Sequence, residues 1–315
     1  MVSQPRPGLA FVFPGQASQR LGMAAELIAR EPTGRSLFQQ AGTLLGLNLA
    51  EICTIGGEEL LTRTDVAQPA LLTTCVAWCA VLRERGTAPQ VVAGHSLGEL
   101  SAWVAAGALE FEDALRLVRR RGELMADAGA RRPGGMAAVI GLGDEQVERI
   151  CQRAAAADIC VVANYNSPGQ VVVSGEPPAL QRVTEAVKAA HGRVIPLRVS
   201  GAFHSPLMED AAHAFAELVS AVPMSPPRIP VVVNVTAEPV TEVEPARHAM
   251  ASQMTSPVLW TASTRRMIAD GIRLFAEVGP GQVLTGLIER ISSDVRALPV
   301  GTLAEMEAFL QEWNP

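Results

Sequence analysis

Short apolar runs alternate with longer helical patterns along most of the chain. Val, Ile, Leu and Phe fill these runs, which predict buried strands at 9–13, 89–94, 231–235 and 272–279. Apolar or amphipathic segments predict helices between them at 66–85, 97–106, 111–127 and 207–222. Strands that alternate with helices in this way predict an α/β domain with a mainly parallel sheet.

The middle of the chain follows a different pattern. Strands are predicted there at 134–142, 159–166, 170–175 and 193–200, and helices at 144–154 and 177–190. The order strand-helix-strand-strand-helix-strand is typical of a ferredoxin-like unit. We therefore predict a small ferredoxin-like domain at 132–200, inserted into a large α/β domain made of 1–131 and 201–315. A glycine and proline cluster at 129–135 is one expected hinge.

The segment VVAGHSLGEL (91–100) joins a predicted strand to a predicted helix through a Gly-x-Ser-x-Gly turn. Such a turn is a nucleophile elbow, in which Ser96 stands at the top of the sheet of an α/β-hydrolase-like domain. The N–H of Leu97 and the positive end of the next helix would face an oxyanion at this serine. The alternative is an ordinary serine in a glycine-rich turn.

A serine nucleophile needs a base, and the chain has five histidines. His204 is the best candidate, because GAFHSPLM (201–208) places it on a loop just before a helix. We expect structural or solvated roles for His191, His213 and His248. His95 is a poor base for its neighbour Ser96, because adjacent side chains on a sharp turn point apart, but it fits the pocket wall.

Arg121 lies on the apolar stripe of the predicted helix 111–127, three residues after Val118 and four before Met125. A buried arginine must be paired, because an isolated buried charge is strongly destabilising. Two partners fit: a protein carboxylate in a structural salt bridge, or a carboxylate on the substrate, which a guanidinium binds with two parallel hydrogen bonds. In the second case the acyl group on the serine carries a free acid.

Composition narrows the class of protein. The 315 residues are 48% hydrophobic, which is enough for a large core, and the net charge of −6 comes without the basic stripe of a nucleic-acid binder. Five cysteines without a Cys-x-x-Cys pair predict buried thiols in a reducing compartment. The start MVSQPRPG lacks an apolar signal region, no apolar run reaches membrane-spanning length, and no metal-ligand cluster stands out. We therefore expect a cytoplasmic monomer that binds no nucleic acid, membrane or metal.

Seven motifs together make the chain similar to one family. They are FVFPGQASQ (11–19), QPALL (68–72), GHSLGELSA (94–102), RRRGELM (119–125), ANYNSPGQVVVSG (163–175), VSGAFHSPLM (199–208) and EVGPGQVLTGL (277–287). In this order they resemble the malonyl-CoA:acyl carrier protein transacylases, the acyltransferases of fatty-acid and polyketide synthesis. Two positions depart from the family's usual pattern, namely Ala17 in place of a second glycine and Leu100 in place of an aromatic residue.

The resemblance implies a role for each matching residue. Ser96 would form the malonyl ester, His204 would activate it, and Arg121 would pair with the malonyl carboxylate. Gln16 would complete the oxyanion hole with the N–H of Leu97. The resemblance also implies that the backbone carbonyl of Gln253 orients the histidine. Phe203 would limit space at the acyl α-carbon and so favour malonyl over methylmalonyl, a filter worth about 1–3 kcal/mol.

The expected activity is therefore transfer of malonyl from malonyl-CoA to the phosphopantetheine thiol of acyl carrier protein, with no bound cofactor. Alternatives are an acyl hydrolase or editing thioesterase on the same fold, and a trans-acting polyketide acyltransferase with another extender unit. A non-catalytic subunit that docks the carrier protein is a further rival, which intact Ser96, His204 and Arg121 oppose. Arg131 and Arg132 are candidates for contact with an acidic carrier protein, and the alternative for them is a plain solvated pair.

Overall fold

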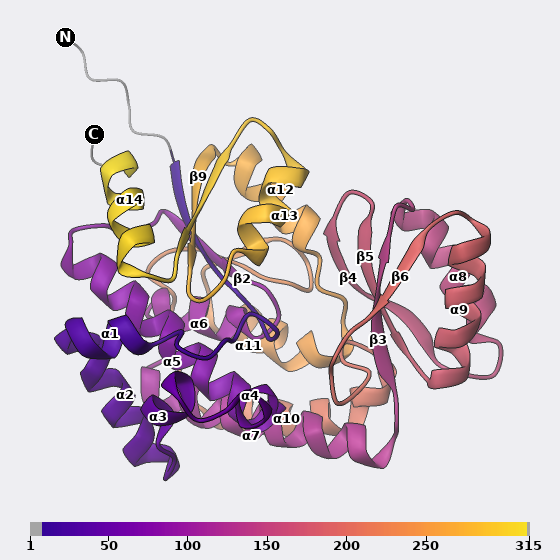
Figure 1. Ribbon diagram of the computed structural model, residues 1–315, viewed down its shortest axis with the longest axis horizontal. Coiled ribbons are helices and arrows are strands. Elements are labelled where there is room, and N and C mark those ends of the chain that lie inside the picture. The colour runs from indigo at the N-terminus through magenta and orange to yellow at the C-terminus, as the bar shows by residue number, and fades with distance from the viewer. Residues whose placement is uncertain (1–7, 314–315) are drawn as a thin grey trace.

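A parallel sheet forms the centre of the larger part of the molecule. The computed structural model describes residues 8–313, and Figure 1 shows the arrangement of their helices and strands. The six-stranded sheet has the order β10-β9-β1-β2-β7-β8. Its strands are β1 (Gly8–Phe13), β2 (Val91–Gly94), β7 (Val231–Val232), β8 (Pro239–Val240), β9 (Ile272–Val278) and β10 (Arg296–Val300). All pairs are parallel except β7 with β8, which confirms the predicted α/β class.

Two edges of this sheet differ from the sequence prediction. The predicted strand 231–235 is wrong in length, because the chain turns after Val232. In that turn the carbonyl of Val233 accepts the N–H of Ala237 at 2.9 Å, and β8 then folds back beside β7. The edge strand β10 was not predicted, since RALPV is short and contains Pro299, which is tolerated at an edge.

Helices cover both faces of the parallel sheet. Their bounds are α1 (Ala25–Arg30), α2 (Pro32–Leu45), α3 (Leu49–Thr54), α4 (Glu58–Thr62), α5 (Thr64–Glu84), α6 (Gly98–Ala105), α7 (Phe111–Arg131), α10 (Glu209–Ala221), α11 (Val243–Ser252), α12 (Trp260–Ala269), α13 (Val283–Ile291) and α14 (Leu303–Trp313). Short 3-10 turns at Pro206–Met208 and Gln253–Thr255 precede α10 and follow α11. Among the described residues α5 alone is apolar and long enough to cross a membrane, and 89% of its apolar window is buried in the core.

A second, antiparallel sheet lies at one end of the long axis of the molecule (Figure 1). Its four strands, in the order β4-β5-β3-β6, are β3 (Gly135–Ile140), β4 (Cys160–Ser167), β5 (Gln170–Gly175) and β6 (Arg193–Pro196). Helices α8 (Asp144–Ala155) and α9 (Pro177–Ala189) pack on one face. The sheet confirms the predicted second unit, although β6 ends at Pro196 rather than at residue 200. The domain boundaries at 131/132 and 200/201 stay a prediction.

The two faces of the small sheet pack against different partners. Successive side chains along a strand point to opposite faces of the sheet. Val139, Val171 and Val173 face α8 and α9 in a core of their own. Ala138 and Val172, on the alternate face, join the main core of the molecule. Strand β4 is also tied to the larger part, because the N–H of Val258 donates to Ala163 at 2.9 Å. One face of the small sheet therefore packs against the larger part of the molecule.

A buried carboxylate fixes one helix beside the carboxyl end of the parallel sheet. Glu277, near the end of β9, has no exposed side-chain surface. Its oxygens accept the N–H of Leu284 at 3.1 Å, the N–H of Thr285 at 2.7 Å and the Thr285 hydroxyl at 2.8 Å. These donors form the first turn of α13, where a negative charge also meets the positive end of the helix dipole.

Replacing this carboxylate should destabilise the fold. Glu277→Ala leaves the buried donors of α13 without an acceptor, so the free energy of unfolding should fall by about 3 kcal/mol in denaturant titration. The exposed Glu289 on the same helix provides the matched control, and Glu289→Ala should change that free energy by no more than about 0.5 kcal/mol. Equal losses in the two variants would show that the contacts of Glu277 are not what stabilises α13.

Candidate active site

The turn between β2 and α6 has the geometry of a nucleophile elbow, here defined as Gly94–Gly98. Ser96 has φ = +51°, a left-handed conformation that costs free energy for any residue other than glycine. A Cβ atom on Gly98 would lie 2.1 Å from the carbonyl oxygen of Phe13, and one on Gly94 would overlap Gly98 itself. The two glycines are therefore required by close approach within the elbow and against the end of β1.

His204 lies directly beside the serine. Its Nε2 is 2.7 Å from Oγ of Ser96. Its Nδ1 lies 3.0 Å from the carbonyl oxygen of Gln253 and 3.1 Å from that of Ser256. Carbonyl oxygens only accept hydrogen bonds, so Nδ1 carries the proton and the lone pair of Nε2 faces the serine hydroxyl. This is the tautomer that a general base needs.

The surroundings of His204 keep it neutral. Its side chain is buried, and burial lowers the pKa from the ordinary value of 6.5 to about 3, assisted by the positive charge of Arg121. The hydrogen bonds to Gln253 and Ser256 oppose this shift without reversing it. Like Ser96, His204 has a positive φ, of 56°, so both members of the pair are held in strained backbone.

Two backbone donors next to the serine are free for a ligand. Within residues 8–313, neither the N–H of Leu97 nor that of Gln16 donates to a protein group. Both residues line the pocket that contains Ser96, while the side-chain amide of Gln16 donates to the hydroxyl of Thr64 at 3.2 Å. Ala17 stands where the family usually has glycine. Its backbone has φ = +80°, a conformation that favours glycine.

Arg121 is buried next to the same hydroxyl. Its Nη2 lies 3.3 Å from Oγ of Ser96 and donates to Oε1 of Gln253 at 2.9 Å. Its Nη1 donates to Oε1 of Gln68 on α5 at 3.0 Å. Gly122 makes this contact possible, because a Cβ there would come within 2.7 Å of the Thr64 carbonyl oxygen and force α5 and α7 apart.

The side chains that form hydrogen bonds with the Arg121 guanidinium in the described structure are all neutral. Within the described residues, Nε of Arg121 has no hydrogen-bond partner and no carboxylate forms an ion pair with the guanidinium. Glu99 is near enough to act electrostatically, and one oxygen of its carboxylate, Oε2, accepts the backbone N–H of Asn234 at 2.6 Å. Burial lowers the pKa of Arg121 to about 10, so it remains a cation at neutral pH. The structural salt bridge that the sequence left open is therefore not formed.

These groups share one cavity of about 300 Å³ between the two sheets. Ser96, His204 and Arg121 line it from the larger part of the molecule, and Ala138 and Val172 line it from the small sheet. Phe203 is 5% exposed and also lines the cavity, where it reduces the space next to His204. His95 contributes to the wall, and its Nε2 lies 2.8 Å from the side-chain oxygen of Asn166.

Several other candidates lie elsewhere. His191, His213 and His248 are exposed and do not line the cavity. Arg131 and Arg132 are exposed at the end of α7, where they line a separate hollow with Asp210. Within residues 8–313 no group of three His, Cys, Asp or Glu side chains could hold a metal ion.

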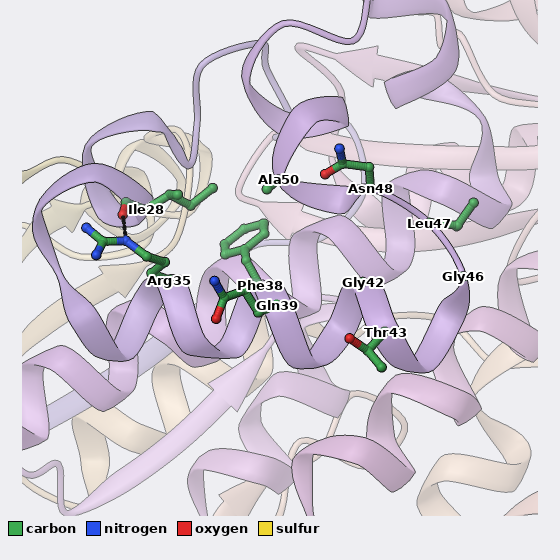
Figure 2. Close-up of a pocket in the computed structure, with 10 residues that line it drawn as sticks. All are labelled: Ile28, Arg35, Phe38, Gln39, Gly42, Thr43, Gly46, Leu47, Asn48 and Ala50. Carbon is green, nitrogen blue, oxygen red and sulfur yellow. Dashed lines mark hydrogen bonds between the residues drawn. The ribbon is translucent and has the colours of Figure 1, made fainter.

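A larger hollow, of about 640 Å³, lies on the surface over α2 and α3 (Figure 2). Two of its polar side chains, Arg35 and Asn48, form hydrogen bonds within the local structure. The guanidinium of Arg35 donates to the carbonyls of Ile28 at 2.9 Å and Ala29 at 2.8 Å, and Asn48 caps α3 by accepting the N–H of Glu51 at 3.2 Å. The residues that line this hollow include no nucleophile paired with a base, so the smaller cavity remains the candidate active site.

Three residues of the site were not identified from the sequence. Gln68, Glu99 and Asn234 are all at most 1% exposed and contact the catalytic candidates or the elbow. The available signal was a polar residue inside an apolar segment: Gln68 in helix 66–85, Glu99 in 97–106 and Asn234 in 231–235. The pattern does not show which polar groups meet, because they come from three separate segments.

Comparison with known proteins assigns the chain to a family. Residues 10–306 match the acyl transferase domain family, so the chain belongs to that family. It is similar to the malonyl CoA-acyl carrier protein transacylases of Salmonella typhimurium and Bacillus subtilis. The identities are 42% and 39%, over 96% of this chain and 99% and 96% of those proteins.

Solved structures agree with this assignment. The malonyl-CoA:acyl carrier protein transacylase from Xanthomonas oryzae pv. oryzae superposes with a TM-score of 0.95 at 41% identity, over 98% of this chain and 99% of that one. A malonyl-transacylase solved in complex with a type II polyketide acyl-carrier protein gives 0.94 at 41% identity, over 97% of this chain and 99% of that one. The fold and its second sheet are thus those of malonyl transacylases.

The pKa of His204 leads to a prediction for the pH dependence of acylation. A general base must be unprotonated, and kcat/KM reports the free enzyme, in which this pKa is about 3. The acid limb of kcat/KM for acylation of Ser96 should therefore lie well below 6.5, measured by intact-protein mass across pH.

Glu99 is a second buried titratable group near the site, and burial raises its pKa to about 7, within the pH range of this experiment. The profile should therefore be measured for Glu99→Gln as well, which removes that titration. An acid limb near 6.5 in both proteins would mean that His204 is an ordinary solvated histidine.

Proposed function

We propose that this protein transfers a malonyl group from malonyl-CoA to the phosphopantetheine thiol of an acyl carrier protein, through an ester on Ser96. The observation that supports this most is the Arg121 guanidinium, which is buried, cationic and 3.3 Å from the nucleophile, and whose hydrogen-bond partners among residues 8–313 are neutral. A malonyl group on Ser96 carries a carboxylate within reach of that cation, and the guanidinium suits two parallel hydrogen bonds to it.

In the first half-reaction, Oγ of Ser96 gives its proton to Nε2 of His204 and attacks the thioester carbonyl. The resulting oxyanion is stabilised by the free N–H groups of Leu97 and Gln16. The carbon–sulfur bond then breaks, His204 returns the proton to sulfur, and CoA leaves as a thiol. Because the carbonyl of Gln253 holds Nδ1–H, the pair works without the acidic third member of a Ser-His-Asp triad.

In the second half-reaction, the thiol of the carrier protein gives its proton to His204 and attacks the malonyl ester. The bond from carbon to Oγ breaks, and Ser96 takes the proton back. Arg121 fixes the acyl group in both halves and therefore contributes orientation. Phe203 narrows the cavity at the acyl α-carbon, which favours malonyl over a methyl-branched acyl group by about 1–3 kcal/mol. The reaction needs no metal or bound cofactor, and we place it in the cytoplasm.

The carrier protein as acceptor is supported by the solved complex of a similar malonyl-transacylase with its type II polyketide acyl-carrier protein. An acyl hydrolase would use the same serine and histidine with water as acceptor, and it would have no need for a cation beside Oγ. The position of Arg121 therefore favours acyl transfer with an acidic acyl group over hydrolysis.

The proposed role of Arg121 predicts a selective defect. Arg121→Ala should depress malonyl loading on Ser96 by about 10²-fold or more, since a charge-assisted pair in a buried site is lost. Acetyl loading should change much less, because acetyl has no carboxylate to bind. Both rates can be followed by intact-protein mass with malonyl-CoA and acetyl-CoA.

Two further proteins complete this experiment. Ser96→Ala should transfer no malonyl to a phosphopantetheinylated carrier protein. Continued transfer would refute catalysis through an ester on Ser96. Arg120→Ala, at an exposed position on the same helix, is the matched control and should load both acyl groups at the wild-type rate. If Arg121→Ala lost malonyl and acetyl loading equally, its carboxylate role would be wrong.

A further inference from the structure

The backbone of the elbow lacks the neighbours that a strand normally provides. Strand β7 pairs with β2 only at Val92 with Val231 and at Ala93 with Val232. The ladder ends beyond this point. Strand β7 turns away after Val232, and the positive φ of Ser96 turns the segment after β2 away from it. The carbonyl of Gly94 and the N–H of Ser96 are then polar groups that need partners.

The side chain of Asn234 supplies both partners. Its Nδ2 donates to the carbonyl oxygen of Gly94 at 2.6 Å, and its Oδ1 accepts the N–H of Ser96 at 2.7 Å. A primary amide carries one donor group and one acceptor, as a peptide unit does. The Asn234 amide thus continues the parallel ladder for one more step, at the point where the backbone of β7 has already left the sheet.

Asn234 is itself held on both sides of its backbone. Its N–H donates to Oε2 of Glu99 at 2.6 Å, and its carbonyl oxygen accepts the N–H of Leu259 at 3.0 Å. Asn234 is 1% exposed and Glu99 is fully buried, so water does not compete for these bonds. Glu99 lies on α6, the helix that begins at the elbow. Hydrogen bonds of Asn234 therefore connect the elbow to the helix that begins there.

We propose that Asn234 is a positioning residue, which holds the elbow in its strained conformation so that Oγ of Ser96 points at His204 and the N–H of Leu97 points into the cavity. Glu99 acts through it by fixing its backbone. This inference rests on acyl transfer through Ser96. Without the two side-chain bonds, relaxation of φ at Ser96 would move both Oγ and the adjacent N–H of Leu97, and so would weaken attack and oxyanion binding together.

Two variants test this assignment. Asn234→Ala removes both hydrogen bonds. Asn234→Asp keeps the volume and the acceptor but puts an oxygen against the Gly94 carbonyl, so it remains informative if the alanine variant does not fold. In both, malonyl loading at saturating malonyl-CoA should slow by about 10²-fold. KM should change little, because Arg121 and the cavity walls are not altered.

Val139→Ala is the matched control for lost stability. Val139 is fully buried in the core between the small sheet and its helices, away from the elbow. Val139→Ala and Asn234→Ala should both lower Tm, but Val139→Ala should still load malonyl at the wild-type rate below its Tm. A folded Asn234 variant that loads malonyl as fast as Val139→Ala, or that changes only KM, would overturn the positioning role.

A second reagent separates this proposal from the choice of substrate. A fluorophosphonate forms a bond from Oγ of Ser96 to phosphorus with loss of fluoride, and it needs an active serine but no acyl carboxylate. Labelling should slow in both Asn234 variants and not in Val139→Ala. If the wild-type protein is labelled but does not load malonyl, the proposed substrate is wrong, and the labelling rates of the variants still decide the role of Asn234.

Discussion

The site depends on the buried positive charge of Arg121, which forms no ion pair with a carboxylate in the described part of the chain. Arg121 is held by the amide oxygens of Gln68 and Gln253, which align the guanidinium without neutralising it. Because a buried charge of this kind is destabilising unless it is paired, the free protein keeps an interaction that a ligand can complete. The same cation lies next to Ser96 and helps to lower the pKa of His204. In the proposed mechanism, selectivity for an acidic acyl group and the neutral state of His204 would thus have a common electrostatic origin.

Gln253 connects this cation to the nucleophile and the base. Its backbone carbonyl accepts Nδ1–H of His204, its Oε1 accepts from Arg121, and its Nε2 donates to the carbonyl oxygen of Ser96 at 3.1 Å. The resemblance implied only the first of these contacts. A single residue on the turn after α11 therefore fixes the relative position of three groups that come from the elbow, α7 and the loop before α10. Strain at Ser96 and His204 is tolerated because such contacts over-determine the backbone.

Features of the fold and site that depend on the sequence of a single segment could be predicted. The Gly-x-Ser-x-Gly turn between an apolar run and a helix predicted the elbow, and the stripe of helix 111–127 predicted that Arg121 is buried. The short strands β8 and β10 and the turn at Val233 were missed, because their formation depends on neighbours in the sheet. Gln68, Glu99 and Asn234 were missed for the same reason, since each is informative only through a partner far away in the sequence.

The central claim is that Arg121 binds the carboxylate of an acyl group carried by Ser96. The most direct test mixes the wild-type protein with malonyl-CoA and acetyl-CoA at equal concentration and records the intact-protein mass before the carrier protein is added. The account predicts that one acyl group is bound, at Ser96, and that it is malonyl almost throughout. A mainly acetylated protein, or an equal mixture of the two esters, would contradict it.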